Sequence, residues 1–218
     1  MNTLIHYAPL LMRGAGVTLG AWLLAGSISI ALGTLLGIVG SEHVGSKKLL
    51  PIVRIYTFIT KGIPAYVQIL IAYFVIPGWL GINVSGFVSA SCALALCSSG
   101  YVTEIVRSGI NAIPQGQWDA CFVLGYTLQA AIQRVIAPQA IRIALPALIG
   151  ELEQLLKSTS LLATIGVTEV TRAGMNIISR ELDPFPVYCV IACIYLGFSA
   201  ILTLLSMYAN KRGRHGYR

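Results

Sequence analysis

The stretch QWDACFVLG, residues 117–125, begins the one polar island in a chain otherwise made of long apolar segments. Pro114 precedes it and is expected to stop the helix before it. Gly125 allows a bend between two short helices, expected at residues 117–124 and 129–135. Pro138 is expected to end the second helix. The island therefore predicts a compact helix, bend and helix.

Such a frame, lying outside a bilayer, is an element that another protein can hold. We expect its exposed anchors to be Trp118 and Asp119. Large aromatic side chains dominate interface energies, and a carboxylate selects a basic partner. The island is therefore interpreted as a docking loop at about residues 114–138.

The rest of the composition indicates an integral membrane protein. The chain has 218 residues, of which 56% are hydrophobic and 11% charged, and its mean hydropathy is +0.78. Soluble domains carry about 25% charged residues. A helical span needs roughly 20 apolar residues, and the chain supplies about five. We expect an all-α, polytopic membrane protein in which residues 1–218 form one transmembrane domain.

The apolar segments predict where the spans lie. The first is expected at residues 14–39. It has two glycine pairs, Gly16 with Gly20 and Gly33 with Gly37, each spaced to admit a second helix closely, from the same chain or from a partner. The second is expected to enter at residues 61–64 and to have its apolar body at 65–75. Three more are expected at about 87–113, 145–165 and 187–208. An amphipathic helix at 167–178 is expected on the outer surface, with Glu169 open to water or to a partner.

Basic residues predict the orientation in the membrane, because cytoplasmic segments carry an excess of lysine and arginine. They gather in three regions that should face the cytoplasm: Lys47, Lys48 and Arg54; Arg134 and Arg142; Lys211, Arg212, Arg214 and Arg218. With five spans, the N-terminus is then outside and the C-terminus is cytoplasmic.

Charges inside the fourth span need an explanation, because each costs at least ~2.5 kcal/mol at the centre of a bilayer. Glu153 and Lys157 are four residues apart and are expected to neutralise each other. Glu151 is left without an evident partner. This group either holds helices together between subunits or forms a wall that contacts substrate. The candidate substrate path comprises Lys61, Gln68, Glu151, Lys157, Ser158, Thr159 and Ser160.

The sequence contains no motif for catalysis. It has no GxxxxGK[ST] phosphate loop, no metal-ligand spacing and no nucleophile triad. We therefore expect no enzymatic activity, no metal and no cofactor in this chain. The positive charge is interpreted as marking the segments that face the cytoplasm, and no nucleic acid partner is expected.

The island resembles the EAA loop of binding-protein-dependent ABC importer permeases. That loop reads Glu-Ala-Ala, three residues, Gly, nine residues, Ile, one residue, Leu-Pro. At the same spacing this chain has Asp119-Ala120-Cys121, Gly125, Val135 and Ala137-Pro138. Further segments, at 101–110, 113–118, 138–146, 156–161 and 165–172, look like the polar amino acid subfamily, and residues 61–64 look like its Arg-Gly-Thr-Pro element. Ser158 departs from the subfamily, which often has Asp there.

The resemblance implies a type I ABC importer (MetI-like) permease in a bacterial inner membrane. It implies a second permease subunit, identical or paralogous, an extracytoplasmic substrate-binding protein, and cytoplasmic ATPase subunits that bind ATP and magnesium. The residues that it assigns to ATPase coupling are Gln117, Trp118, Asp119, Ala120 and Gly125.

A polar amino acid is the expected substrate. A cationic one is favoured, because Glu151 and the hydroxyls at 158–160 could replace the hydration of an ammonium or guanidinium group. Two other functions remain open at this point: an ion-coupled secondary transporter, favoured by the intramembrane carboxylates, and a non-transporting membrane scaffold.

Overall fold

The computed structural model describes residues 2–214, and Arg218 of the basic tail lies outside them. Within residues 2–214 every element of regular secondary structure is a helix, and there are no strands. The helical segments are α1 Asn2–Val39, α2 Leu50–Gly62, α3 Ala65–Leu70, η1 Ile71–Val75, α4 Ile76–Leu80, α5 Gly86–Asn111, α6 Gln115–Val123, α7 Leu128–Ala131, η2 Ile132–Ile136, α8 Ala137–Ser158, η3 Thr159–Ile165, α9 Val170–Glu181 and α10 Pro184–Arg214.

In the described part of the chain, four continuous helical stretches are long and apolar enough to cross a membrane. They are His6–Val39, Gly86–Asn111, Leu128–Ile165 and Pro184–Leu204. A fifth span arises if the bent pair Leu50–Gly62 and Ala65–Leu80 is counted as one. The predicted number of about five spans is therefore confirmed.

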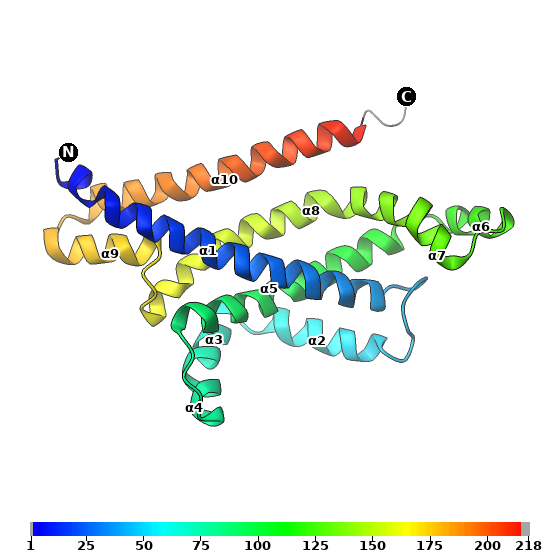
Figure 1. Ribbon diagram of the computed structural model, residues 1–218, viewed down its shortest axis with the longest axis horizontal. Helices are drawn as coiled ribbons and strands as arrows, with labels where there is room; N and C mark the ends of the chain where they lie inside the picture. Colours follow the sequence, from blue (N-terminus) through cyan, green and yellow to red (C-terminus); the bar gives the residue numbers. More distant parts are fainter. Residues whose placement is uncertain (1, 215–218) are drawn as a thin grey trace.

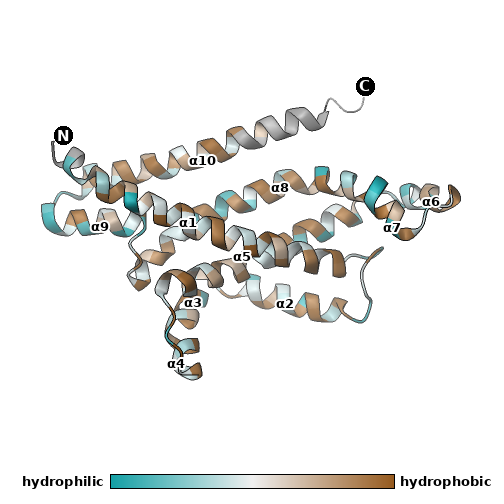
Figure 2. Ribbon diagram, viewed as in Figure 1, coloured by the Kyte–Doolittle hydropathy of each residue, from teal (hydrophilic) through white to brown (hydrophobic). Residues whose placement is uncertain are grey.

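The long helices run side by side along the longest axis of the molecule (Figure 1). α1 packs along α5, and α5 packs against α2 and α8. α9 and the N-terminus lie at one end of this bundle, while α6 and α7 lie at the other. Hydrophilic residues gather at these two ends, and the middle is mainly hydrophobic (Figure 2).

Two glycines allow the close approach of α1 to α5. A Cβ at Gly33 would lie 2.5 Å from the Cβ of Val102, and one at Gly37 would lie 2.8 Å from the Cβ of Val106. Ordinary carbon contacts are about 3.5–4.0 Å. At Gly33 and Gly37 the predicted small-residue contact therefore lies within one chain and fixes α5, which carries much of the candidate site. At Gly16 no atom lies within 4 Å of an added Cβ.

The second span differs from the prediction. The chain forms α2 before residue 61, and a bend of 97° separates this helix from α3. Ile63 is extended (φ −91°, ψ 129°) because the following Pro64 disfavours helical geometry there. The Gln68 amide Nε2 donates to the carbonyls of Thr60 and Ile63, both at 2.8 Å, and so bridges the bend.

The expectation that Pro138 ends a helix is wrong. The helical path continues from Leu128 to Ile165. Pro138 lies in the first turn of α8, directly after the π-helical turn η2. A π turn changes the hydrogen-bond register, so the missing N–H of proline is absorbed where one helix type passes into the other.

α9 has the predicted amphipathic character, with Val170, Ala173 and Ile177 buried. The expectation that Glu169 is open to water is wrong, because this residue is 0% exposed. Its carboxylate caps α9 by accepting from the backbone N–H groups of Thr171 and Arg172, both at 2.8 Å. Burial raises the pKa of Glu169, although these hydrogen bonds act in the opposite direction.

Candidate functional site

A cavity of about 280 Å³, lined by both polar and apolar residues, lies between α2, α5 and α8. The bend after α2 contributes Ile63, Pro64 and Ala65 to its wall. The other lining residues come from the three helices: Lys61; Leu94, Cys97, Ser98 and Tyr101; Glu151, Gln154, Leu155 and Ser158. Helices that are distant in sequence thus bring one cation and one carboxylate to the same cavity.

Glu151 has a partner that the sequence did not reveal. The Ser98 hydroxyl donates to Glu151 Oε1 at 2.6 Å, and the Ser29 hydroxyl donates to Ser98 Oγ at 2.9 Å. Both serines are buried. A chain of hydroxyls therefore runs from α1 through α5 and orients the carboxylate on α8 toward the cavity wall.

Lys61 stands in the last turn of α2, on another wall of the cavity. Its Nζ lies 5.5 Å from the ring centroid of Tyr101 on α5. The aromatic face attracts the ammonium group, a contact worth about 0.5–1 kcal/mol at an exposed site. The contact keeps the cation beside the cavity.

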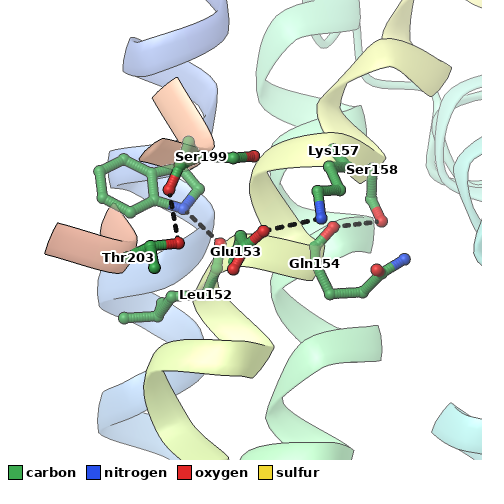
Figure 3. Close-up of polar contacts among 8 residues, drawn as sticks. Leu152, Glu153, Gln154, Lys157, Ser158, Ser199 and Thr203 are labelled. Atoms are coloured by element: carbon green, nitrogen blue, oxygen red, sulfur yellow. Dashed lines mark hydrogen bonds and ion pairs between the residues drawn. The ribbon is translucent and has the colours of Figure 1, made fainter. Parts of the chain in front are cut away.

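Two candidate residues on α8 lie close in sequence but play different parts. Lys157 Nζ forms an ion pair with Glu153 Oε1 at 2.8 Å, as predicted, and neither residue lines the cavity (Figure 3). Ser158 does line it, and its hydroxyl donates to the Gln154 carbonyl at 2.9 Å. The charge pair is thus separate from the cavity.

The remaining candidates of the substrate path are engaged elsewhere. The Thr159 hydroxyl is buried and donates to the Leu156 carbonyl at 2.7 Å. The Ser160 hydroxyl donates to the Lys157 carbonyl at 2.8 Å. Gln68 bridges the bend and lines a second, mainly apolar cavity of about 470 Å³. None of these three is among the lining residues of the first cavity.

The cavity includes residues that the sequence reading did not single out, among them Ser98, Tyr101 and Gln154. Helical spacing was the signal that could have found them. Positions 151, 154, 155 and 158 share one face of α8, and positions 94, 97, 98 and 101 share one face of α5. If one residue of either set is identified as lining a cavity, the helical spacing predicts that the other residues of that set line it too.

The docking loop has the predicted helix and bend, but the role of Trp118 is different. α6 covers Gln115–Val123, and Gly125 has the left-handed φ of 76° that a bend here requires. The expectation that Trp118 is an exposed anchor is wrong, because its side chain is 2% exposed. It packs into a cluster with Ile110, Ile113, Ile136 and Ala140.

The other coupling candidates lie at the surface. Asp119 is exposed and accepts from Gln115 Nε2 at 2.9 Å. Gln117 Oε1 accepts from Gln139 Nε2 at 3.2 Å, which ties α6 to α8. Ala120 and Gly125 are exposed as well.

Other large apolar side chains, at the end of α6, have the exposure that was expected of Trp118. Phe122 is 50%, Val123 86% and Leu124 73% exposed. These three residues form an apolar tip at the end of the bundle opposite the N-terminus (Figure 1). Exposed apolar side chains grouped in this way are typical of a surface that contacts another protein or a membrane.

Apolar spans around a cavity that carries a lysine and a glutamate, with a folded loop at one end, fit the class of helical membrane transport proteins. A model of the family "Binding-protein-dependent transport system inner membrane component" matches residues 15–215. The chain belongs to this family. It is therefore the membrane, non-catalytic component of such a system, and neither of the two other functions is supported.

Individual relatives support this assignment. The chain is 34% identical over 214 residues to the probable amino-acid ABC transporter permease protein YckA of Bacillus subtilis, covering 97% of this chain and 92% of that protein. It is 29% identical to the arginine transport system permease protein ArtQ of the same organism, covering 95% and 94%. A crystal structure of an amino acid ABC transporter with histidines superposes with a TM-score of 0.86 at 33% identity, covering 96% of each chain. The type I importer (MetI-like) fold is confirmed.

Proposed function

We propose that this permease carries a polar amino acid, preferentially a cationic one, across the cytoplasmic membrane. The observation that carries the proposal is the cavity that has Lys61 on one wall and Glu151 on another. An amino acid zwitterion offers a carboxylate to the lysine and an ammonium group to the glutamate. A guanidinium or second ammonium group makes the match to Glu151 stronger.

The size of the cavity supports a small solute. Ligand sites for drug-sized molecules occupy about 300–1,000 Å³, and this cavity holds about 280 Å³. A volume of this size is sufficient for one amino acid. The likeness to ArtQ, whose name specifies arginine transport, supports the preference for a cation.

Coupling to ATP is proposed at α6. Cytoplasmic ATPase subunits, which bind ATP and magnesium, grip the apolar tip Phe122, Val123 and Leu124 and the carboxylate of Asp119, all of which are exposed. The buried Trp118 then passes the movement of α6 to α5 and α8, whose residues it contacts. The free energy for this shift comes from the ATPase, because its contacts with α6 differ between its two nucleotide states.

The proposed orientation places the N-terminus outside and the docking loop in the cytoplasm. The two lie at opposite ends of the bundle (Figure 1), and the basic residues of the loop region favour the cytoplasmic side. A second permease, identical or paralogous, completes the translocation path, and an extracytoplasmic binding protein delivers the amino acid at the N-terminal end.

Uptake by the complete importer in proteoliposomes tests the substrate site. We expect Glu151→Gln to lower the uptake of arginine or lysine by about 10- to 100-fold, since hydrogen bonds to charged groups contribute about 1.5–3 kcal/mol. Glu153→Gln is the matched control on the same helix, because Glu153 pairs with Lys157 and does not line the cavity. Uptake confined to acidic or apolar amino acids would contradict the proposal.

A further inference from the structure

The segment between α1 and α2, residues 40–49, is a folded loop with a fixed shape. The N–H of Gly45 donates to the Ser41 carbonyl at 3.0 Å, and the N–H of Ser46 donates to the Val39 carbonyl at 3.1 Å. A Cβ at Gly45 would lie 2.2 Å and 2.3 Å from these two carbonyl oxygens, so only glycine fits. This α1–α2 loop is therefore held in one conformation, so that a displacement at one of its ends moves the other end as well.

The α1–α2 loop covers the indole of Trp118. The His43 ring stacks on the Trp118 ring with centroids 4.9 Å apart and planes at 27°. The next residue, Val44, packs against the same cluster as Trp118. The N–H of Glu42 also donates to Asn111 Oδ1 at the end of α5, at 3.1 Å. The loop is thus attached to both α6 and α5.

The stack matters because the indole has no polar anchor. Trp118 Nε1 is buried and, within residues 2–214, has no hydrogen-bond acceptor. A buried N–H without an acceptor costs free energy that neighbouring contacts must offset. The orientation of Trp118 therefore depends on the apolar cluster beneath it and on the His43 ring above it.

The same loop leads directly into a helix that ends at the cavity. The N–H of Leu50, the first residue of α2, donates to the Ser46 carbonyl at 3.0 Å. α2 then runs for 13 residues, a rise of about 20 Å, to the turn that carries Lys61. Its buried face, with Val53, Thr57 and Thr60, lies against α5. One short helix thus joins the cover of Trp118 to a wall of the cavity.

We propose that His43 is a positioning residue of the transport cycle. Stacked on Trp118, it passes the displacement of α6 through the α1–α2 loop and α2 to the Lys61 wall of the cavity. The proposal rests on the proposed role of α6 as the element that the ATPase grips. α5 offers a parallel route, because its Ile110 lies in the same apolar cluster as Trp118 and its Ser98 lines the cavity. In the proposed cycle, α5 alone does not carry the displacement of α6 to the Lys61 wall of the cavity.

Native Cys97 lines the cavity and serves as the reporter. The other four cysteines, Cys92, Cys121, Cys189 and Cys193, are replaced by alanine. The complete importer in nanodiscs is treated with a small charged methanethiosulfonate reagent, without nucleotide and after trapping with ATP, magnesium and orthovanadate. The measured quantity is the ratio of the Cys97 labelling rates in the two states. Co-purification of the ATPase is recorded separately.

We expect His43→Ala to reduce this ratio by about two- to tenfold, the factor that corresponds to the free energy of an aromatic pair. The ATPase should still co-purify. His43→Phe, which keeps a flat ring, should retain the wild-type ratio. Lys48→Ala in the same loop is the control, because its exposed side chain takes no part in the stack. If His43→Ala fails to assemble, His43→Leu, which fills the space without a ring, replaces it with the same expectation.

The outcomes separate this inference from the proposed function. A wild-type ratio in His43→Ala or His43→Leu overturns the role of His43 and leaves the importer intact. A loss of ratio in His43→Phe equal to that in His43→Ala also overturns it, because the ring is then irrelevant. If the Cys97 labelling rate of the chain with native His43 is the same with and without trapped nucleotide, the proposed alternation and the role of His43 are both refuted.

Discussion

Gly33→Ala should destabilise this permease even though alanine is the better helix former. The new Cβ would lie 2.5 Å from Val102 Cβ and 2.8 Å from the Ser99 carbonyl oxygen. Relief requires α1 and α5 to separate by about 1 Å to reach ordinary contact distances. Overpacking of this kind costs about 1–3 kcal/mol, and the gain in helix propensity returns about 1 kcal/mol. Since a backbone carbonyl cannot rotate away, we expect the overpacking cost to lie in the upper part of that range, about 2–3 kcal/mol, and the net loss to be about 1–2 kcal/mol.

The matched control is Gly16→Ala on the same helix, where no atom lies within 4 Å of the added Cβ. It should leave stability unchanged or raise it by up to about 1 kcal/mol. Thermal unfolding in detergent is the assay, and a loss of 1–2 kcal/mol corresponds to roughly 2–8 °C in Tm for a chain of this length. If Gly33→Ala melts with or above Gly16→Ala, the close packing of α1 on α5 is refuted.

Two further predictions concern the ends of the bundle. Asp119→Arg combined with Gly125→Pro should abolish ATPase association, because it reverses an exposed charge and removes a residue with φ of 76°; association and uptake that survive both changes would disprove coupling at α6. Glu169→Gln should alter the pH dependence of Tm. Burial raises the folded-state pKa of Glu169 above its ordinary 4.5, so the folded state binds the extra proton and wild-type stability falls as pH rises through that window. We therefore expect wild type to gain Tm relative to Glu169→Gln as the pH is lowered from 7 toward 4.5; parallel profiles would show that this carboxylate does not titrate there.

Features that depend on local spacing could be predicted from the sequence. The helix and bend of the docking loop follow from Pro114 and Gly125, and the pair Glu153 and Lys157 follows from a separation of four residues. The total apolar length predicts the number of spans. In these cases the interacting groups are neighbours in the chain, so the sequence alone contains the geometry.

Features that depend on packing between distant segments could not be predicted. Trp118 is buried because residues near 43 fold over it, and nothing within the docking loop indicates that cover. The partner of Glu151 lies 53 residues away and is set by the register of α5 on α8. Pro138 suggests a helix end by its own chemistry, whereas the preceding π turn decides the outcome.

The bend after α2 has a practical consequence for handling the protein. Beyond it, the segment α3, η1 and α4 runs at 97° to α2; its first part packs on α5 and its end projects from the bundle (Figure 1). No charged residue occurs between Lys61 and Glu104. Phe74, Trp79 and Leu80 are 62%, 91% and 63% exposed. An outlying arm of this kind stays soluble only while lipid, detergent or a companion chain coats it. Delipidation before the importer has assembled should therefore precipitate the chain, and co-expression with its companions is the rational starting point for purification.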